Sequence, residues 1–82
     1  MNSKFEQIYD TYYDSVYRYI YVSVKDKWKA EDIITTVFTK IYEDKNKIID
    51  IETSKNWVFR ITNNTIMEFY RKTGKELPSE YR

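Results

Sequence analysis

The side chains with the clearest chemistry lie in residues 57–72, where polar and apolar residues alternate at helical spacing. Arg60, Arg71 and Lys72 are cations that can neutralise phosphate groups, whereas Glu68 is the only acid of this stretch. The alternative is an ordinary solvated helix end, because the helix macrodipole favours basic residues in the last turn. The charges alone leave both interpretations open.

Amide and apolar side chains of the same stretch suit contact with nucleotides. Asn63 and Asn64 each present a hydrogen-bond donor and an acceptor, the combination that pairs with base edges. Phe59, Met67 and Tyr70 add apolar surface against which unstacked bases can pack. The stretch is therefore a candidate nucleic-acid surface.

No catalytic or metal-binding constellation accompanies these residues. The chain contains no Cys and no His, which excludes thiol nucleophiles, disulfide bonds, imidazole acid–base chemistry and zinc sites of the Cys/His type. Glu31 and Asp32 are neighbours in a predicted helix, so their carboxylates point about 100° apart and do not converge. Glycine-rich phosphate loops and nucleophile elbows are also missing. We therefore expect no enzyme activity, no cofactor and no metal.

The composition predicts one small helical protein. Its 82 residues include one Gly and one Pro, too few turn formers for an all-β chain. No apolar stretch approaches the ~20 residues of a membrane span, and the N-terminus lacks a signal-peptide pattern. The absence of Cys fits a reducing compartment. We expect a soluble, cytoplasmic protein that does not contact membranes.

Hydrophobic residues recur at spacings of three and four in three segments, which predicts an all-α bundle of three main helices. The helices are expected over about residues 3–24, 27–44 and 54–73. A loop or a short helix is expected between the second and the third. The three apolar stripes should meet in one core, since a chain of this length supports a single small core.

Capping residues support these boundaries. Ser3 and Glu6 have the spacing of a capping box at the start of the first helix. Asp26 is a suitable N-cap for the second helix, and Thr53 or Ser54 for the third.

Each predicted helix has an apolar stripe that we expect to face the core. The stripe of the first helix consists of Phe5, Ile8, Tyr9, Tyr12, Tyr13, Val16, Tyr17, Ile20 and Val24. The stripe of the second consists of Trp28, Ala30, Ile33, Ile34, Val37, Phe38, Ile41 and Tyr42. The stripe of the third consists of Trp57, Val58, Ile61, Thr65, Ile66 and Phe69.

The net charge of +1 is unevenly distributed. Residues 1–54 hold eight Lys and Arg against ten Asp and Glu, whereas residues 55–82 hold six against three. The positive excess therefore lies on and after the third helix, as an anion-binding face requires. An excess of three charges is also compatible with a merely soluble C-terminal end.

Threonine is unusually frequent on the polar side of the second helix. Its β-branched side chain is a poor choice for an exposed helix position, so three threonines in one face suggest a surface that a partner covers. An ordinary solvated face is the alternative. The residues of this face are Asp32, Thr35, Thr36, Thr39, Lys40 and Glu43.

The order of the motifs resembles region 2 of the sigma-70 family of RNA polymerase sigma factors, in the extracytoplasmic-function (ECF) type. The stretch "AEDIITTVFTKIY" is similar to the family's Asp-Ala-Glu-Asp-Leu-Val-Gln-Glu-Thr-Phe motif. The stretch "NWVFRITNNTIMEFYRK" is similar to its Trp-Leu-Phe-Arg-Ile-Ala-x-Asn helix. Together with the Tyr-rich start, the resemblance covers about residues 4–76.

This resemblance implies a transcription initiation module that binds core RNA polymerase and promoter DNA. In the family, the second helix docks on the clamp helices of the largest polymerase subunit. The resemblance therefore makes the threonine-rich face, Asp32, Thr35, Thr36, Thr39, Lys40 and Glu43, the polymerase-binding surface. Thr35 and Thr36 replace the family's usual Gln-Glu pair, so the hydrogen bonds to polymerase are expected to differ.

The resemblance also implies that the third helix and the loop before it recognise and melt the −10 promoter element, holding a flipped base of the single-stranded non-template strand. The loop comprises Ile49, Asp50, Ile51, Glu52, Thr53 and Ser54. The helix contacts are Asn56, Arg60, Asn63, Asn64, Met67 and Arg71, with Lys72 and Lys75 on phosphates. The loop has isoleucines where the family often has aromatic residues.

The domain is predicted over residues 1–76. Gly74 suits the left-handed position after a helix and Pro78 prevents its continuation, so residues 77–82 are expected to begin a linker. The family's second domain, the region 4 helix-turn-helix, is missing from these residues, which suggests an excised domain or a truncated factor. An anti-sigma factor is a further partner that the resemblance allows.

A second hypothesis comes from a different class of protein. The chain would then be a small protein–protein interaction domain without a DNA role, docking through its Tyr-rich first helix. Tyr19 and Tyr21 are the tyrosines expected to be exposed, and tyrosine is enriched at interface cores.

Overall fold

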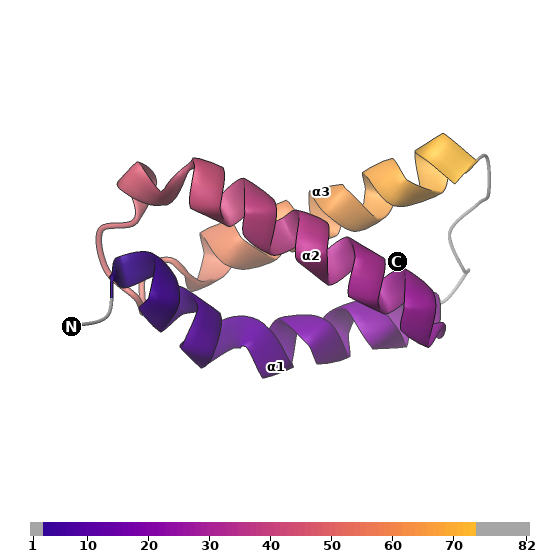
Figure 1. Cartoon of the computed structure of the whole chain (residues 1–82), viewed down its shortest axis with the longest axis horizontal. Coiled ribbons are helices and arrows are strands. Elements are labelled where there is room, and N and C mark those ends of the chain that lie inside the picture. The colour runs from indigo at the N-terminus through magenta and orange to yellow at the C-terminus, as the bar shows by residue number, and fades with distance from the viewer. Residues whose placement is uncertain (1–2, 74–82) are drawn as a thin grey trace.

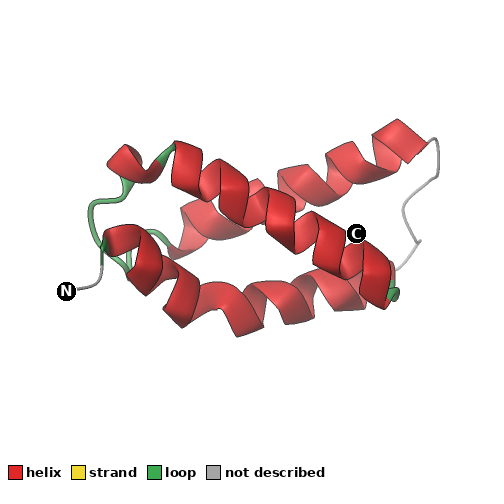
Figure 2. Ribbon diagram, viewed as in Figure 1, coloured by secondary structure: helices red, strands yellow, loops and turns green. Residues whose placement is uncertain are grey.

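The computed structural model describes residues 3–73, and in this range the chain folds into three long helices and one short one (Figure 1). These are α1 (Lys4–Val24), α2 (Lys27–Glu43), the 3-10 helix η1 (Lys45–Lys47) and α3 (Lys55–Thr73). The described residues contain no strand (Figure 2). The predicted all-α bundle is confirmed, and the expected loop or short helix is η1 with the residues that follow it.

Helices α1 and α2 run antiparallel and are joined by two residues only. Lys25 ends α1 in the left-handed conformation, with φ 54° and ψ 37°, and its N–H donates to the Tyr21 carbonyl at 2.7 Å. Asp26 then caps α2 by accepting from the Lys29 N–H at 3.0 Å. This tight turn places α2 directly against α1, and the prediction for Asp26 is confirmed.

The two other predicted caps differ in outcome. The capping box is present, since the Ser3 hydroxyl accepts from the Glu6 N–H and the Glu6 carboxylate accepts from the Ser3 N–H. Ser54 directly precedes α3, and its carbonyl accepts from the Val58 N–H. Its hydroxyl, however, donates to the carbonyl of Asp50 at 2.6 Å. This side chain therefore ties the preceding loop to the helix start.

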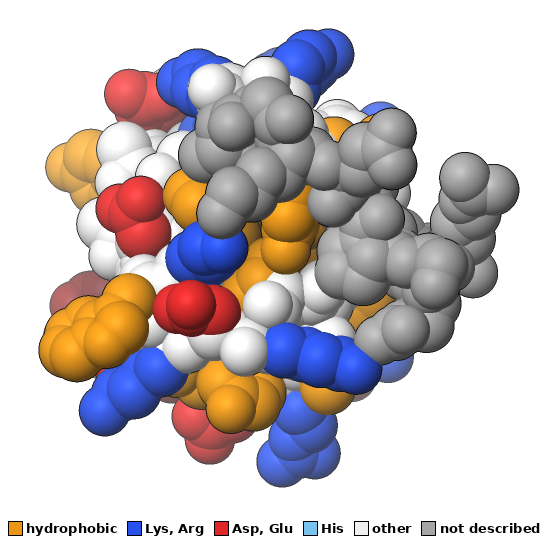
Figure 3. All heavy atoms as spheres, turned by 90° about the vertical axis from the view of Figure 1, so that its right-hand side faces the viewer, with side chains coloured by type: hydrophobic (Ala, Val, Ile, Leu, Met, Phe, Trp, Pro, Cys, Tyr) orange, Lys and Arg blue, Asp and Glu red, His pale blue; other side chains and the backbone are white. Residues whose placement is uncertain are grey.

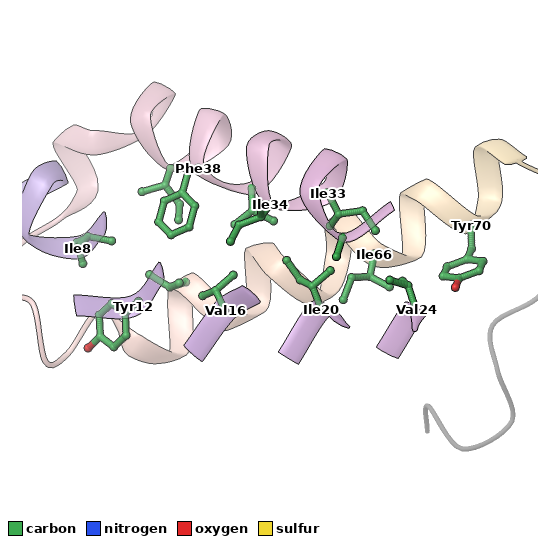
Figure 4. Close-up of a cluster of buried hydrophobic side chains, with 14 of the residues drawn as sticks. Ile8, Tyr12, Val16, Ile20, Val24, Ile33, Ile34, Phe38, Ile66 and Tyr70 are labelled. Carbon is green, nitrogen blue, oxygen red and sulfur yellow. The ribbon is translucent and has the colours of Figure 1, made fainter. Parts of the chain in front are cut away.

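The core lies where the three helices face one another (Figure 4). Helix α1 contributes every fourth residue, because this spacing keeps side chains on one face of a helix. The buried hydrophobic residues of α1 are Ile8, Tyr12, Val16, Ile20 and Val24, and those of α2 are Ala30, Ile33, Ile34, Val37, Phe38 and Ile41. Helix α3 buries Val58, Thr62, Thr65, Ile66 and Tyr70.

Two aromatic residues assigned to the core of α2 are exposed instead. Trp28 is 76% exposed, because it precedes Ala30 by two residues and so lies on the opposite side of the helix. Tyr42 is 52% exposed at the last turn, where its ring meets Phe5 edge-on at 5.2 Å and lies 4.0 Å from the Lys45 ammonium.

The buried face of α3 is centred differently from the prediction. Val58, Thr62 and Ile66 are fully buried, whereas Trp57 and Phe69, which the periodicity assigned to the core, are only half-buried. Thr62 is tolerated in the core because its hydroxyl donates to the Val58 carbonyl at 2.9 Å. Threonine is a polar residue, so the hydropathy pattern did not reveal that the centre of the buried stripe includes threonines.

Candidate functional site

The loop before α3 is fixed against α1 by two hydrogen bonds from side chains far away in the sequence. The Tyr12 hydroxyl donates to the Ile51 carbonyl at 2.7 Å, and the Lys4 ammonium donates to the Ile49 carbonyl at 2.9 Å. Ile48 is buried and adds an apolar anchor at the start of the loop. Tyr12 itself is buried, and burial raises the pKa of its hydroxyl. The loop therefore presents a defined surface.

Asp50 organises the other end of the loop. Its carboxylate accepts from the Thr53 N–H at 3.2 Å, and its carbonyl accepts from the N–H of Ser54 at 3.1 Å and from the Ser54 hydroxyl. These bonds form a turn that leads directly into α3. Of the predicted loop contacts, Asp50 and Ile51 thus hold the loop in place. Glu52 is exposed.

The loop before α3 borders a hollow of about 210 Å³, which is distinct from a hollow of about 270 Å³ between α2 and α3. This loop hollow is lined by Lys47, Ile49, Thr53, Ser54 and Trp57. Its walls combine an aromatic ring, an aliphatic side chain that is 81% exposed at Ile49, hydroxyl groups and one cation. Such a set can stack on a planar ring and hydrogen-bond to its edge.

The exposed face of α3 carries five of the predicted DNA contacts in one line. Their spacings of four, four, three and four residues place them on a single side of the helix, opposite the buried residues. We call this set the outer stripe: Asn56, Arg60, Asn64, Met67 and Arg71, all of which are exposed. Asn56 is next to Trp57 in the chain, so the loop hollow lies at the N-terminal end of the outer stripe.

The remaining predicted contacts of α3 lie off the outer stripe. Asn63 is half-buried and accepts a hydrogen bond from the Tyr19 hydroxyl of α1 at 3.3 Å. Lys72 lines the hollow between α2 and α3. Lys75 is outside the described residues, as are Gly74 and the expected linker.

Two aromatic residues expected to contact bases are engaged in packing. Tyr70 is buried, with 7% of its surface exposed. Phe59 is half-buried and meets the ring of Tyr19 edge-on at 5.7 Å. Met67 is 44% exposed, so of the three apolar side chains it is the one that the outer stripe presents to solvent.

The threonine hydroxyls of α2 bond to their own helix. Thr35, Thr36 and Thr39 donate to the carbonyls four residues earlier, at 2.9, 3.2 and 2.8 Å. Each hydroxyl therefore has its acceptor within α2 and needs no hydrogen bond to a partner protein. The polar face predicted to bind polymerase is exposed at Asp32, Thr35, Thr36, Thr39 and Glu43. We call these five residues the threonine face.

Lys40, the sixth predicted polymerase contact, points toward α3. Its ammonium lies 2.6 Å from the Glu68 carboxylate and 3.1 Å from the Thr65 hydroxyl. This hydrogen bond from Lys40, with further attraction from nearby cations including Arg71, holds the pKa of Glu68 below its usual value. The lone acid of α3 is therefore neutralised from α2, and the negative charge facing a bound anion is reduced.

The hollow between α2 and α3 brings the two predicted surfaces together. It is lined by Asp32 and Thr36 of the threonine face, by Glu68 and Lys72 of α3, and by core residues. The end of the molecule where α2 begins and α1 and α3 end is shown in Figure 3. Cations and anions interleave there around hydrophobic side chains, so that end is not uniformly charged.

Sequence reasoning missed two members of the loop hollow. Trp57 was assigned to the core, and Lys47 was given no role. The role of Trp57 in the loop hollow could have been predicted from its position in the first turn of α3, beside a loop without aromatic residues. The placement of Lys47 depends on η1, which no sequence pattern specified.

Over residues 3–73 no cluster of three or more potential ligands could hold a metal ion. None of the helices in this range is both long and apolar enough to cross a membrane.

The family model described as Sigma-70 region 2 matches residues 8–76. Three curated relatives come from Bacillus subtilis (strain 168). The RNA polymerase sigma factor SigZ is 36% identical over 75 residues, which cover 89% of this chain and 43% of SigZ.

The other two relatives are named ECF RNA polymerase sigma factors. SigX is 26% identical over 72 residues, covering 88% of this chain and 37% of SigX. SigM is 32% identical over 72 residues, covering 88% of this chain and 44% of SigM. The chain thus spans less than half the length of each of these relatives. No solved structure is significantly similar to it.

Proposed function

Because the chain belongs to the sigma-70 region 2 family, as an ECF-type member, we propose that it serves transcription initiation by binding core RNA polymerase and the −10 promoter element. It does so without catalysing a reaction. The single observation that supports the DNA part most strongly is the loop hollow, fixed to α1 by Tyr12 and Lys4 and open beside the outer stripe.

Base capture takes place in the loop hollow. Extruding a base from a duplex costs a few kcal/mol of stacking and pairing, and a pocket that holds the base offsets part of this cost. Trp57 supplies the aromatic surface that the loop itself lacks, and Ile49 adds an apolar side chain to the lining. Lys47 and the hydroxyl of Thr53, both exposed in the lining of the hollow, supply polar contacts to the base edge or its phosphate.

The outer stripe binds the neighbouring nucleotides of the same strand. Arg60 and Arg71 lie on one exposed side of α3 and can each contact a phosphate, whereas Asn64 between them can pair with a base edge. Few cations are involved, so the affinity for DNA is low and binding depends on polymerase to hold the module at the promoter.

Polymerase binds through the threonine face of α2. The clamp helices would lie against side chains whose hydroxyl donors are already satisfied by their own helix, so the methyl groups and the carboxylate of Asp32 supply the contact. Lys40 joins this helix to α3 through Glu68, so the ion pair links the proposed polymerase surface to the proposed DNA surface.

Tryptophan fluorescence tests the base-capture step. Trp28→Phe leaves Trp57 as the single tryptophan and changes a side chain that is 76% exposed. We expect oligo-dT single strands carrying one dA, dC or dG to quench this fluorescence, because a stacked base is a quencher, and the matching duplexes to quench it far less.

The matched variant Trp57→Phe keeps Trp28 as the reporter. Its fluorescence should not respond to the same strands, because Trp28 is in the first turn of α2, at the end of that helix away from the loop, and does not line the loop hollow (Figure 1). Equal quenching of Trp57 by single strands and duplexes, or quenching of Trp28, would count against base capture and leave only nonspecific charge.

A further inference from the structure

The hollow between α2 and α3 is lined by two opposite charges that do not pair with each other. Asp32 lies in the second turn of α2 and Lys72 in the last turn of α3, and both line this hollow of about 270 Å³. Both side chains are exposed, and neither forms an ion pair with another residue of the range 3–73. A carboxylate and an ammonium group therefore face the same space from different helices without closing it.

The other charged groups of the hollow are already engaged. The Lys40 ammonium bridges the Glu68 carboxylate at 2.6 Å and the Thr65 hydroxyl at 3.1 Å. Thr65 is buried, and its hydroxyl also donates to a carbonyl of its own helix at 2.7 Å. The charges that remain for a ligand are therefore those of Asp32 and Lys72.

Apolar and hydroxyl groups complete the lining. Ile33 is buried and Phe69 is half-buried, so both offer apolar surface to a molecule in the hollow. The Thr36 hydroxyl donates to the Asp32 carbonyl at 3.2 Å, which leaves its oxygen able to accept a hydrogen bond. The volume lies just below the ~300–1,000 Å³ of pockets for drug-sized ligands, so the hollow suits a smaller molecule.

We propose that this hollow binds a free α-amino acid with an apolar side chain. The ammonium group of the ligand donates to the Asp32 carboxylate and to the Thr36 hydroxyl, and its carboxylate accepts from Lys72. Its side chain covers Ile33 and Phe69 and so removes apolar surface from water. A zwitterion of this kind satisfies both open charges of the hollow at once.

Charge decides against simpler ligands. An anion such as phosphate meets the carboxylates of Asp32 and Glu68, whereas a simple amine meets the ammonium groups of Lys40 and Lys72. A bound metal ion is not supported either, because residues 3–73 contain no cluster of three potential ligands. A molecule that carries both charges avoids either repulsion.

A bound amino acid covers part of the threonine face, because Asp32 and Thr36 belong to both surfaces. This consequence rests on the proposed polymerase contact: the ligand and the clamp helices compete for the same two side chains. The loop hollow and the outer stripe share no residue with the hollow between α2 and α3, so the proposed DNA contacts stay open when the ligand is bound.

The binding site is tested by amide chemical shifts in NMR, recorded while the 82-residue chain is titrated with L-leucine. We expect saturable shifts confined to residues 32–36 and 65–72, with binding in the millimolar range for so small a ligand. Two matched probes each lack one charge: L-leucinamide has no carboxylate, and 4-methylpentanoate has no ammonium group. Both should bind about tenfold more weakly or worse, because each leaves one charge of the hollow without a partner.

Neutral variants identify the two charges. Asp32→Asn and Lys72→Gln should each weaken the binding of L-leucine by about tenfold. The controls Glu31→Gln and Lys55→Gln remove exposed charges of the same two helices outside the hollow, and they should bind L-leucine as the unchanged chain does. Circular dichroism confirms that all four variants are helical.

Competition is measured by calorimetry with a clamp-helix fragment of the largest polymerase subunit. Saturating L-leucine should weaken binding of this fragment by about tenfold, because it covers Asp32 and Thr36. The effect of L-leucine should be lost in Lys72→Gln, which removes a ligand contact that is not part of the threonine face.

Three results of the titration would overturn the proposed site: shifts spread over the whole chain, equal binding of L-leucine and either probe, or normal binding by both Asp32→Asn and Lys72→Gln. Saturable binding at the hollow without any loss of fragment affinity would overturn the competition. A fragment that fails to bind even without L-leucine would instead contradict the proposed function, because the NMR titration contains no polymerase.

Discussion

Lys40 of α2 and Glu68 of α3 form an ion pair, with 2.6 Å between Nζ and Oε1, that links the helix proposed for polymerase binding to the helix proposed for DNA binding. The pair is partly exposed, with 33% and 47% of the two side chains accessible. Solvent screening therefore limits its contribution to the free energy of unfolding. The buried core packs α2 against α3, and the ion pair adds a polar link between the two helices at their surface.

The ion pair makes stability depend on pH in the acid range. The pKa of Glu68 is lowered in the folded chain, so the carboxylate stabilises the fold above its ordinary pKa of 4.5 and this contribution disappears as the pH falls through the lowered value. A double-mutant cycle of Lys40→Met and Glu68→Gln should give a coupling of about 0.5 kcal/mol at neutral pH. Urea unfolding at neutral and acidic pH measures it. A coupling that persists after Glu68 is protonated would contradict the assignment.

The helices were predictable from the sequence because each has its own apolar period and its own start signal. The capping box at Ser3 and Glu6, the cap at Asp26 and the every-fourth-residue row from Ile8 all lie within single helices. Local rules suffice for such features. The order of the motifs was enough to predict the family, and the match over residues 8–76 confirms it.

The functional surface was less predictable because it depends on contacts between distant parts of the chain. Nothing in the sequence indicates that the Tyr12 hydroxyl reaches the Ile51 carbonyl, 39 residues later. Likewise, Lys40 and Asn63 are polar residues on predicted polar faces, yet neighbouring helices engage both. Tyr70 is aromatic with a polar end, so its burial depended on packing that periodicity does not specify.

Removing the Tyr12 hydroxyl should release the loop. Tyr12→Phe is expected to lower the free energy of unfolding by about 1 kcal/mol, because the Ile51 carbonyl loses its donor. Hydrogen exchange should accelerate in residues 48–54, and quenching of Trp57 by single strands should require more DNA. Tyr21→Phe is the matched control, since Tyr21 is exposed in the last turn of α1, and it should leave the loop unchanged.

The Tyr12 hydroxyl should also make the stability of the fold depend on pH in the alkaline range. Burial, followed by the nearby carboxylates of Glu52 and Asp50, raises the pKa of Tyr12 above 10.0. Folding therefore favours the protonated form, and this stabilisation is present below pH 10.0 and lost as the pH rises through the raised value. Tyr12→Phe should accordingly unfold with a weaker alkaline dependence than the unchanged chain. An identical alkaline profile would argue against this contribution.

Neighbouring asparagines should separate DNA contact from packing. Asn64→Ala is expected to weaken binding of single-stranded DNA by about tenfold with little change in stability, because Asn64 is exposed on the outer stripe. Asn63→Ala should instead lower the stability of the fold with little change in DNA binding, because the Tyr19 hydroxyl loses its acceptor. Fluorescence anisotropy of labelled single strands and urea unfolding measure the two effects. Equal losses of affinity in both variants would show that the outer stripe does not determine binding.

Polymerase binding should depend on the threonine face alone. Asp32→Arg and Thr36→Arg are expected to weaken binding to a clamp-helix fragment of the largest polymerase subunit by about tenfold or more, because each places a long cation in the contact. Glu52→Arg changes an acid of the loop that is also exposed, and it should leave this binding intact while altering DNA binding. Calorimetry with the fragment provides the measurement. If Asp32→Arg and Thr36→Arg bind normally while Glu52→Arg does not, polymerase contacts the loop side of the molecule, and the proposed division between α2 and α3 is wrong.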